Sequence, residues 1–282
     1  MLYFKLLRVN HYLKNLLIFL PLIFSINFFN LPYFILVATG FLSFSLLASA
    51  IYIINDIKDR HEDAMHPTKK MRPISSGEIP IRTGISIGVF LLAAAFIGGL
   101  ALFQIQESPG ILIFPFLYLL NNYAYTFKIK QIPILDVLSI AVGFLFRVMF
   151  GASIINVPVS PFLYLTILTL AFYMGYGKRR GEYKAAHQRK SLQRYSLKFL
   201  EKNMTMCVTL AIVFYVMWTL ALSDDYMILM VTTPLILLIL MRYNFILEGQ
   251  SDGDPIEVVI KDRLLFGSVA AYGGVLITLL YV

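Results

Sequence analysis

Nine long apolar runs determine what this chain can fold into. They lie near residues 15–30, 33–54, 82–104, 110–127, 134–156, 160–177, 204–222, 226–243 and 264–282. Each is long enough to cross about 30 Å of hydrocarbon. Of the 282 residues, 59% are hydrophobic and 14% are charged, whereas soluble domains are about 25% charged. We therefore expect an all-α integral membrane protein with nine transmembrane helices, forming a single domain over residues 1–282.

The lysines and arginines fall on one side of this arrangement. Apart from Arg147, all of them precede the first run or accompany alternate loops, near residues 55–81, 128–133, 178–203 and 244–263. Loops rich in Lys and Arg face the cytoplasm. We therefore expect the N-terminus and these loops in the cytoplasm, and the C-terminus outside a plasma membrane. The net charge of +8 favours lipid head groups and phosphorylated substrates over nucleic acid as partners.

An acidic cluster follows the second apolar run. On a helix, Asn55, Asp56, Asp59 and Asp63 fall within an arc of about 100°. Carboxylates crowded in this way repel one another unless a cation neutralises them. Mg²⁺ fits best, because it takes oxygen ligands and shares carboxylates with substrate phosphates. The alternative is an acidic helix start capped by Asn55, which explains one or two acids but not four such groups.

Basic residues come next along the chain. Lys69 and Arg72 follow the acidic cluster, and Lys178, Arg179 and Arg180 end the sixth run. They are candidates for binding phosphate oxygens, although basic loops at a membrane surface need no further explanation. Prolines 67 and 73 and Gly77 predict a defined turn in the first of these segments.

Asp136 and Arg147 are charged residues of the fifth run. Eleven residues separate them, which places both on one helix face, about 16 Å apart along the axis. They cannot form one direct ion pair, so each must face a cavity or have its own partner. For Arg147, a buried structural ion pair with another helix and a substrate contact remain equal alternatives. Cys207 is the single cysteine, which excludes an internal disulfide.

The pattern N-D-x-x-D-x-x-x-D, Asn55 to Asp63, resembles the UbiA superfamily of membrane transferases, and the resemblance covers essentially the full length. It implies a UbiA-type helix bundle with an active site open to the cytoplasm. In that superfamily this motif binds Mg²⁺ and the diphosphate of the donor. Asn55, Asp56, Asp59 and Asp63 are then the metal ligands, and the three aspartates are catalytic.

Further stretches resemble the decaprenyl-phosphate phosphoribosyltransferase branch. They include H-Y-L-K-N, H-P-T-K-K-M-R-P-I-S-S-G, Y-T-F-K-I-K and G-K-R-R-G-E. Ordinary prenyltransferases of the superfamily have a second motif, D-x-x-x-D, but here Ile140 stands four positions after Asp136. This departure favours a soluble donor, phosphoribosyl pyrophosphate, and a polyprenyl phosphate acceptor.

The resemblance thus implies Mg-dependent transfer of 5-phosphoribose to a polyprenyl (decaprenyl) phosphate with release of pyrophosphate. Lys69, Arg72 and residues 178–180 would bind the donor's phosphates, with Lys14, Tyr125 and Lys130 as further polar contacts and Asp136 on a ribose hydroxyl. One alternative is a prenyltransferase with a prenyl diphosphate donor and an aromatic or lipid acceptor. A more distant one is a transporter. Homo-oligomerisation is left open.

Overall fold

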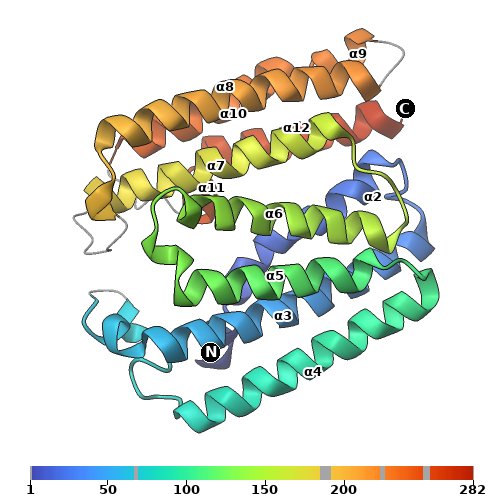
Figure 1. Ribbon diagram of the computed structural model, residues 1–282. Coiled ribbons are helices and arrows are strands. Elements are labelled where there is room, and N and C mark those ends of the chain that lie inside the picture. The colour runs from blue at the N-terminus through green and yellow to red at the C-terminus, as the bar shows by residue number, and fades with distance from the viewer. Residues whose placement is uncertain (1, 67–68, 185–191, 223–225, 250–254, 282) are drawn as a thin grey trace. The chain divides into compact units, whose positions relative to one another are not determined.

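The computed structural model describes residues 2–66, 69–184, 192–222, 226–249 and 255–281. Throughout this part of the chain the secondary structure is helical, without strands (Figure 1). The chain divides into two compact units. The N-terminal unit comprises Met1–Phe127 and Phe146–Val157, and the C-terminal unit comprises Lys128–Leu145 and Pro158–Val282. Helix α6 (Leu135–Ile154) contributes residues to both.

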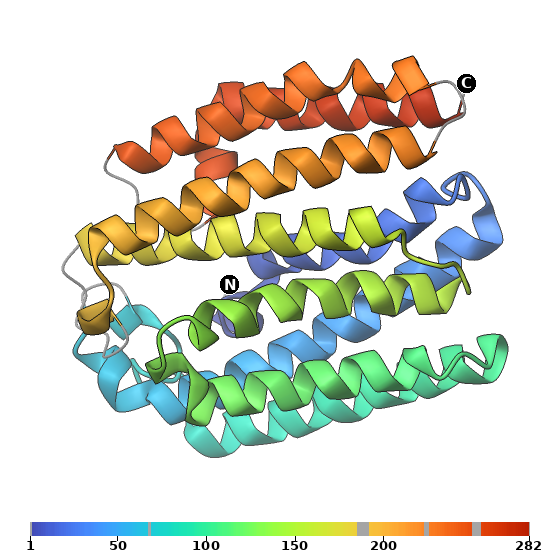
Figure 2. The same cartoon turned by 45° about the horizontal axis from the view of Figure 1, so that its top comes forward.

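The N-terminal unit is built around one long helix, α3 (Leu31–Ala64). Helices α4 (Ile81–Gln106) and α5 (Gly110–Phe127) pack along it (Figure 2). The chain before α3 also contacts it; it consists of α1 (Leu2–Leu7), η1 (Val9–Phe19) and α2 (Leu20–Phe24). A short turn, η2 (Lys69–Met71), follows α3.

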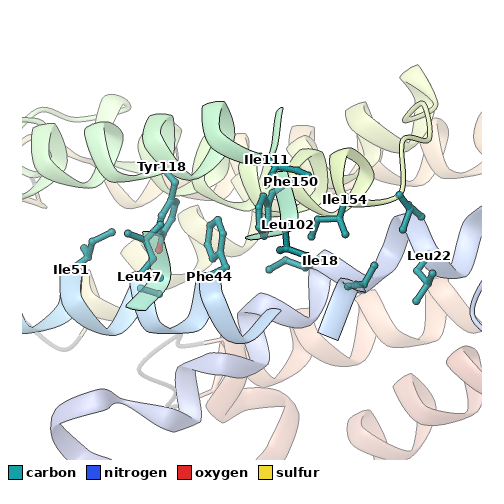
Figure 3. Packing of buried hydrophobic residues seen from close by; sticks show 14 residues of the cluster. Ile18, Leu22, Phe44, Leu47, Ile51, Leu102, Ile111, Tyr118, Phe150 and Ile154 are labelled. Carbon is teal, nitrogen blue, oxygen red and sulfur yellow. The ribbon is translucent and has the colours of Figure 1, made fainter. Parts of the chain in front are cut away.

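Aromatic and aliphatic side chains from η1, α2, α3, α4, α5 and α6 form the core of this unit (Figure 3). The ring of Phe44 lies 4.7 Å from that of Tyr118 and 5.4 Å from that of Phe150, measured between centroids. The backbone of η1 reaches this core at Gly151, where an added Cβ would lie 2.1 Å from the carbonyl oxygen of Ile18. A glycine is therefore required for this close approach.

The C-terminal unit begins with η3 (Ile129–Gln131) and the start of α6. It continues through α7 (Pro161–Lys184), η4 (Leu192–Arg194), α8 (Leu197–Leu222), α9 (Tyr226–Met230), α10 (Thr233–Glu248), α11 (Pro255–Lys261) and α12 (Arg263–Tyr281). Helix α7 packs on α8, and α10 packs on α8 and α12. Tyrosines and leucines make up most of the buried core, and the rings of Tyr173 and Tyr243 lie 5.6 Å apart.

Six helices of the described chain are long and apolar enough to cross a membrane: Leu31–Ala64, Ile81–Gln106, Leu135–Ile154, Leu197–Ala221, Ile228–Glu248 and Arg263–Tyr281. This makes the chain a multi-pass membrane protein. Two more of the nine predicted runs form the helices α5 and α7. The first predicted run differs most from the expected single helix. Its helical structure ends at Phe24, and it changes from η1 to α2 next to Pro21. Proline has no N–H to donate to the preceding turn, so η1 does not continue through it.

Three predicted loops are partly helical. Helix α3 continues through the acidic cluster to Ala64, α7 extends to Lys184, and α11 forms before α12. The turn expected around Pro73 is present: Gly77 has a φ of 79°, and the N–H of Ile79 donates to the carbonyl of Pro73 at 2.9 Å. Pro67 and the loop segments 185–191 and 250–254 lie outside the described residues.

Candidate active site

The acidic cluster lies on the last turns of α3. With 34 residues, this helix is about 51 Å long, whereas the hydrocarbon of a bilayer is about 30 Å thick. One end of α3 therefore extends beyond the hydrocarbon. The polar and charged residues from Asn55 to Asp63 occupy the C-terminal end of the helix, directly after its apolar part.

A single arginine nitrogen joins two of the aspartates. Nη1 of Arg72 lies 3.1 Å from Oδ1 of Asp56 and 2.5 Å from Oδ2 of Asp63. Seven residues separate the two aspartates, so they lie on one helix face two turns apart. Both carboxylates are buried. The local fold thus gathers two acidic side chains around one cationic atom supplied by the turn that follows α3.

A second arginine reaches the same cluster from the N-terminus. Nη2 of Arg8 contacts Oδ1 of Asp56, the oxygen that also accepts from Arg72. The guanidinium of Arg8 lies 4.9 Å from the centre of the Tyr52 ring, which stands one turn before Asp56. The His11 ring packs perpendicular to the same Tyr52 ring, with 5.2 Å between the centroids. Arg8 has a left-handed backbone conformation with a φ of 52° between α1 and η1.

The other predicted site residues of this unit occupy α3 and the elements around it. Oδ1 of Asn55 accepts a hydrogen bond from the hydroxyl of Thr126 on α5, next to Tyr125. Asp59 is half-buried between the two ion-paired aspartates. Lys69 is exposed in η2, and Lys14 is half-buried on η1.

The donor atoms of this cluster suit a hard divalent cation. Asp56, Asp59, Asp63 and Asn55 offer only oxygen ligands, the type that Mg²⁺ takes. The observation that two carboxylates converge on one Arg72 nitrogen indicates that they can serve one positive charge together. Within the described residues, however, no three His, Cys, Asp or Glu side chains already stand in a metal-binding arrangement. The chemistry therefore fits Mg²⁺, while guanidinium groups contact the oxygens that would bind it.

The remaining predicted site residues belong to the C-terminal unit, where Asp136 and Arg179 form a buried ion pair. Nε of Arg179 lies 2.8 Å from Oδ2 of Asp136, and both side chains are at most 1% exposed. The hydroxyl of Tyr195 donates to Oδ1 of Asp136 at 2.7 Å and accepts from the N–H of Ile134. Burial raises the pKa of Tyr195, which keeps its hydroxyl protonated as a donor. Arg179 also pairs with Glu182.

Arg180 interacts with the end of α10. Its Nη1 donates to the carbonyl of Leu247 at 2.8 Å, and its Nε and Nη2 reach Glu201 on α8. A cation at a helix C-terminus satisfies free carbonyls and complements the helix dipole. Lys178 on α7 and Lys130 on η3 are half-buried.

Arg147 and Asp136 have separate partners, as expected from their separation along α6. In the N-terminal unit, Nε of Arg147 donates to Oδ1 of Asn15 and its Nη2 to the hydroxyl of Tyr118, both at 2.8 Å. The guanidinium also lies 4.6 Å from the Tyr118 ring and 5.4 Å from the Phe44 ring. These contacts join η1, α3, α5 and α6 and give Arg147 a structural role, with a neutral amide oxygen and a hydroxyl as partners where the structural alternative had been an ion pair.

The sequence did not predict three residues that contact the predicted site residues: Arg8, Thr126 and Tyr195. Arg8 was counted only among the basic residues before the first run, and its link to Asp56 spans 48 positions. One signal for it existed: Tyr52 precedes Asp56 by one helical turn, and an aromatic face beside a carboxylate is a site that arginine favours. Thr126 and Tyr195 have no comparable local signal.

Comparison with known proteins identifies the family. Residues 17–259 match the UbiA prenyltransferase family. The chain belongs to this family. Its relatives include the decaprenyl-phosphate phosphoribosyltransferase of Corynebacterium glutamicum, 30% identical over 275 residues, which cover 93% of this chain and 81% of that protein. The enzyme of the same name from Mycolicibacterium smegmatis is 30% identical over 244 residues, which cover 81% and 75%.

Solved structures show that the fold is that of UbiA homologs. A UbiA homolog from Archaeoglobus fulgidus bound to GPP and Mg²⁺ aligns with a TM-score of 0.73 and 21% identity, covering 99% of this chain and all of that chain. The same homolog bound to Cd²⁺ aligns with a TM-score of 0.71 and 19% identity, covering the whole of both chains. At this identity the likeness establishes the fold alone.

Proposed function

We propose that this UbiA-family protein transfers 5-phosphoribose from phosphoribosyl pyrophosphate to a polyprenyl phosphate and releases pyrophosphate. The observation that carries the proposal is the 30% identity to decaprenyl-phosphate phosphoribosyltransferases over most of the chain. The acidic and basic cluster of the N-terminal unit supports it, because a soluble polyanionic donor needs both a divalent cation and basic groups. Family membership leaves the transporter alternative without support.

In this proposal Asp56, Asp59 and Asp63, assisted by Asn55, hold Mg²⁺. When bound, Mg²⁺ neutralises negative charge on the departing pyrophosphate. Arg72, Lys69 and Lys14 bind phosphate oxygens, and Tyr125 adds a polar contact. Arg8 joins them, since it contacts the same carboxylate as Arg72.

Bond formation needs little from the protein beyond positioning. An oxygen of the acceptor's phosphate attacks C1 of the ribose as the bond to pyrophosphate breaks. This oxygen is already anionic, so no strong general base is required. Ile140 in place of a second aspartate after Asp136 agrees with a donor that needs only one acidic cluster.

Lys130, Asp136, Lys178, Arg179 and Arg180 stay predicted substrate contacts. Asp136 and Arg179 form a buried ion pair, and Arg180 interacts with α10. To contact substrate, each of these three would first have to leave its partners, so we assign the donor's phosphates mainly to the basic residues of the N-terminal unit.

We also propose nine spans in one domain of the plasma membrane, with the N-terminus and the acidic cluster in the cytoplasm and the C-terminus outside. The placement of the Lys and Arg residues other than Arg147 supports this orientation. A cytoplasmic site gives direct access to a soluble donor, while the lipid acceptor approaches from the bilayer.

The test uses purified protein with Mg²⁺, labelled phosphoribosyl pyrophosphate and a short polyprenyl phosphate. We expect label in the lipid fraction and release of pyrophosphate, both abolished by a chelator. A parallel reaction contains a prenyl diphosphate and an aromatic acceptor. Turnover in that reaction, without a labelled lipid in the first, would favour the alternative of a conventional prenyltransferase.

A further inference from the structure

Two arginines contact carboxylates that the proposed function assigns to a metal ion. Arg72 bridges Asp56 and Asp63 through one nitrogen, and Arg8 contacts the same Oδ1 atom of Asp56. Mg²⁺ binds oxygen ligands at about 2.0–2.1 Å. A metal ion at Oδ1 of Asp56 or Oδ2 of Asp63 would therefore lie next to these guanidinium nitrogens, so like-charge repulsion sets the metal ion and the arginines in competition.

The two sides of this cluster differ in exposure. The carboxylates of Asp56 and Asp63 are 1% and 5% exposed, whereas the side chains of Arg8 and Arg72 are 18% and 27% exposed. Leaving a buried carboxylate without a cation is costly, but a partly exposed guanidinium can turn toward water or toward an anionic ligand. The arginines are thus the members of the cluster that can move away from the carboxylates and be replaced there by another cation.

We propose that Arg8 and Arg72 act as built-in counter-ions that compete with the divalent cation and are drawn away by the diphosphate of the donor. When a metal–diphosphate complex arrives, the metal takes the carboxylates and the guanidinium groups pair with phosphate oxygens. Each buried carboxylate keeps a cation throughout the exchange. Metal and diphosphate therefore bind cooperatively, and the metal alone binds weakly.

This inference rests on the proposed use of the aspartates as metal ligands, but it concerns binding rather than turnover. For the affinity of the metal alone, it makes a different prediction from that of a simple phosphate-binding role. If Arg72 only binds phosphate, its removal leaves the affinity for the metal alone unchanged. If Arg72 competes with the metal, its removal raises that affinity and reduces the additional gain from diphosphate.

The experiment measures Mn²⁺ binding to the full-length protein in detergent, from the electron paramagnetic resonance signal of free Mn²⁺, with and without inorganic pyrophosphate. For the wild type we expect affinity to rise at least about tenfold with pyrophosphate. For Arg72→Gln we expect Mn²⁺ alone to bind at least about tenfold tighter than in the wild type, with a smaller gain from pyrophosphate. Arg8→Gln should change both quantities in the same directions.

Arg60→Gln is the matched control. Arg60 lies on α3 beside Asp59, and its Nη1 donates to the carbonyl of Ile57 rather than to either buried aspartate. The Arg60→Gln variant loses the same positive charge as Arg72→Gln. Equal effects of the two variants on Mn²⁺ affinity would therefore overturn the proposal in favour of a general charge effect. Unchanged or weaker Mn²⁺ binding in both Arg72→Gln and Arg8→Gln would also overturn it. Because neither ribose nor lipid is present, failure of phosphoribosyl transfer would be a separate result.

Discussion

At the scale of single residues, the acidic cluster combines helix spacing with partners from distant parts of the chain. Asp56 and Asp63 share a helix face because seven residues separate them. Their burial is tolerated because Arg8 and Arg72 supply positive charge. Asp59 lies between them and is half-buried, which makes it the aspartate whose substitution is least disruptive to folding.

Asp59→Asn should lower phosphoribosyl transfer by at least about 100-fold, equivalent to ~2.7 kcal/mol, because an amide lacks the negative charge with which the Asp59 carboxylate would attract the metal ion. A steady-state assay with labelled donor measures the loss, and the thermal unfolding of the variant should match that of the wild type. Glu62→Gln, an exposed position on the same helix, is the control. Retained activity in Asp59→Asn would remove this residue from the proposed site.

Asp262 provides a residue-level test of pH dependence. Its hydrogen bonds from Arg242 and from the N–H of Leu265 lower the pKa of this carboxyl. A lowered pKa means that the carboxylate stabilises the folded protein at pH values above its ordinary value of 3.8, and that this contribution disappears as the pH falls through the lowered value. Unfolding curves of the wild type and Asp262→Asn should therefore differ at neutral pH and converge in acid. A difference independent of pH would refute this.

At the scale of elements, close contacts between helices set the packing of the N-terminal unit. The guanidinium of Arg147 on α6 donates hydrogen bonds to Asn15 on η1 and Tyr118 on α5. In hydrocarbon such groups need partners within the protein. The contact between η1 and α6 further depends on Gly151, since any side chain there would meet the backbone of Ile18.

Gly151→Ala should destabilise the protein by about 1–3 kcal/mol, because the new methyl group would push η1 away from α6. Thermal unfolding in detergent measures the change. Gly267→Ala on α12 is the matched control: nothing lies within 4 Å of its added Cβ, and alanine favours helix more than glycine does. Equal stabilities of the two variants would contradict the close-packing argument.

At the scale of the whole molecule, basic residues and apolar runs together define a multi-pass protein with polar chemistry at helix ends. The described chain has six helices that clearly qualify as spans. The nine-span orientation remains a proposal, and it depends on the one-sided distribution of Lys and Arg rather than on any single helix boundary.

Single cysteines test that orientation in intact cells. In a Cys207→Ser background, a membrane-impermeant maleimide added outside should label Ser108→Cys but not Lys128→Cys, because the connection at residue 108 lacks Lys and Arg. Permeabilised cells should show labelling of both. Labelling of Lys128→Cys in intact cells would reverse the orientation.

Sequence alone was sufficient for properties that depend on local order along the chain. Apolar runs predicted a helical membrane protein, and motif spacing predicted the family, since both follow from side-chain periodicity and from short stretches of chain. The continuation of α3 to Ala64 and the turn at Gly77 agree with the helix and turn interpretations of their segments.

Only the tertiary structure decided which charges are neutralised by which partners. Arg8 reaches Asp56 across 48 positions, and Tyr195 reaches Asp136 across 59; no periodicity connects such residues. It also paired Asp136 with Arg179 and assigned Arg147 to Asn15 and Tyr118. The physical reason is that a buried charge takes its partner from whatever element packs beside it, and packing is a property of the whole fold.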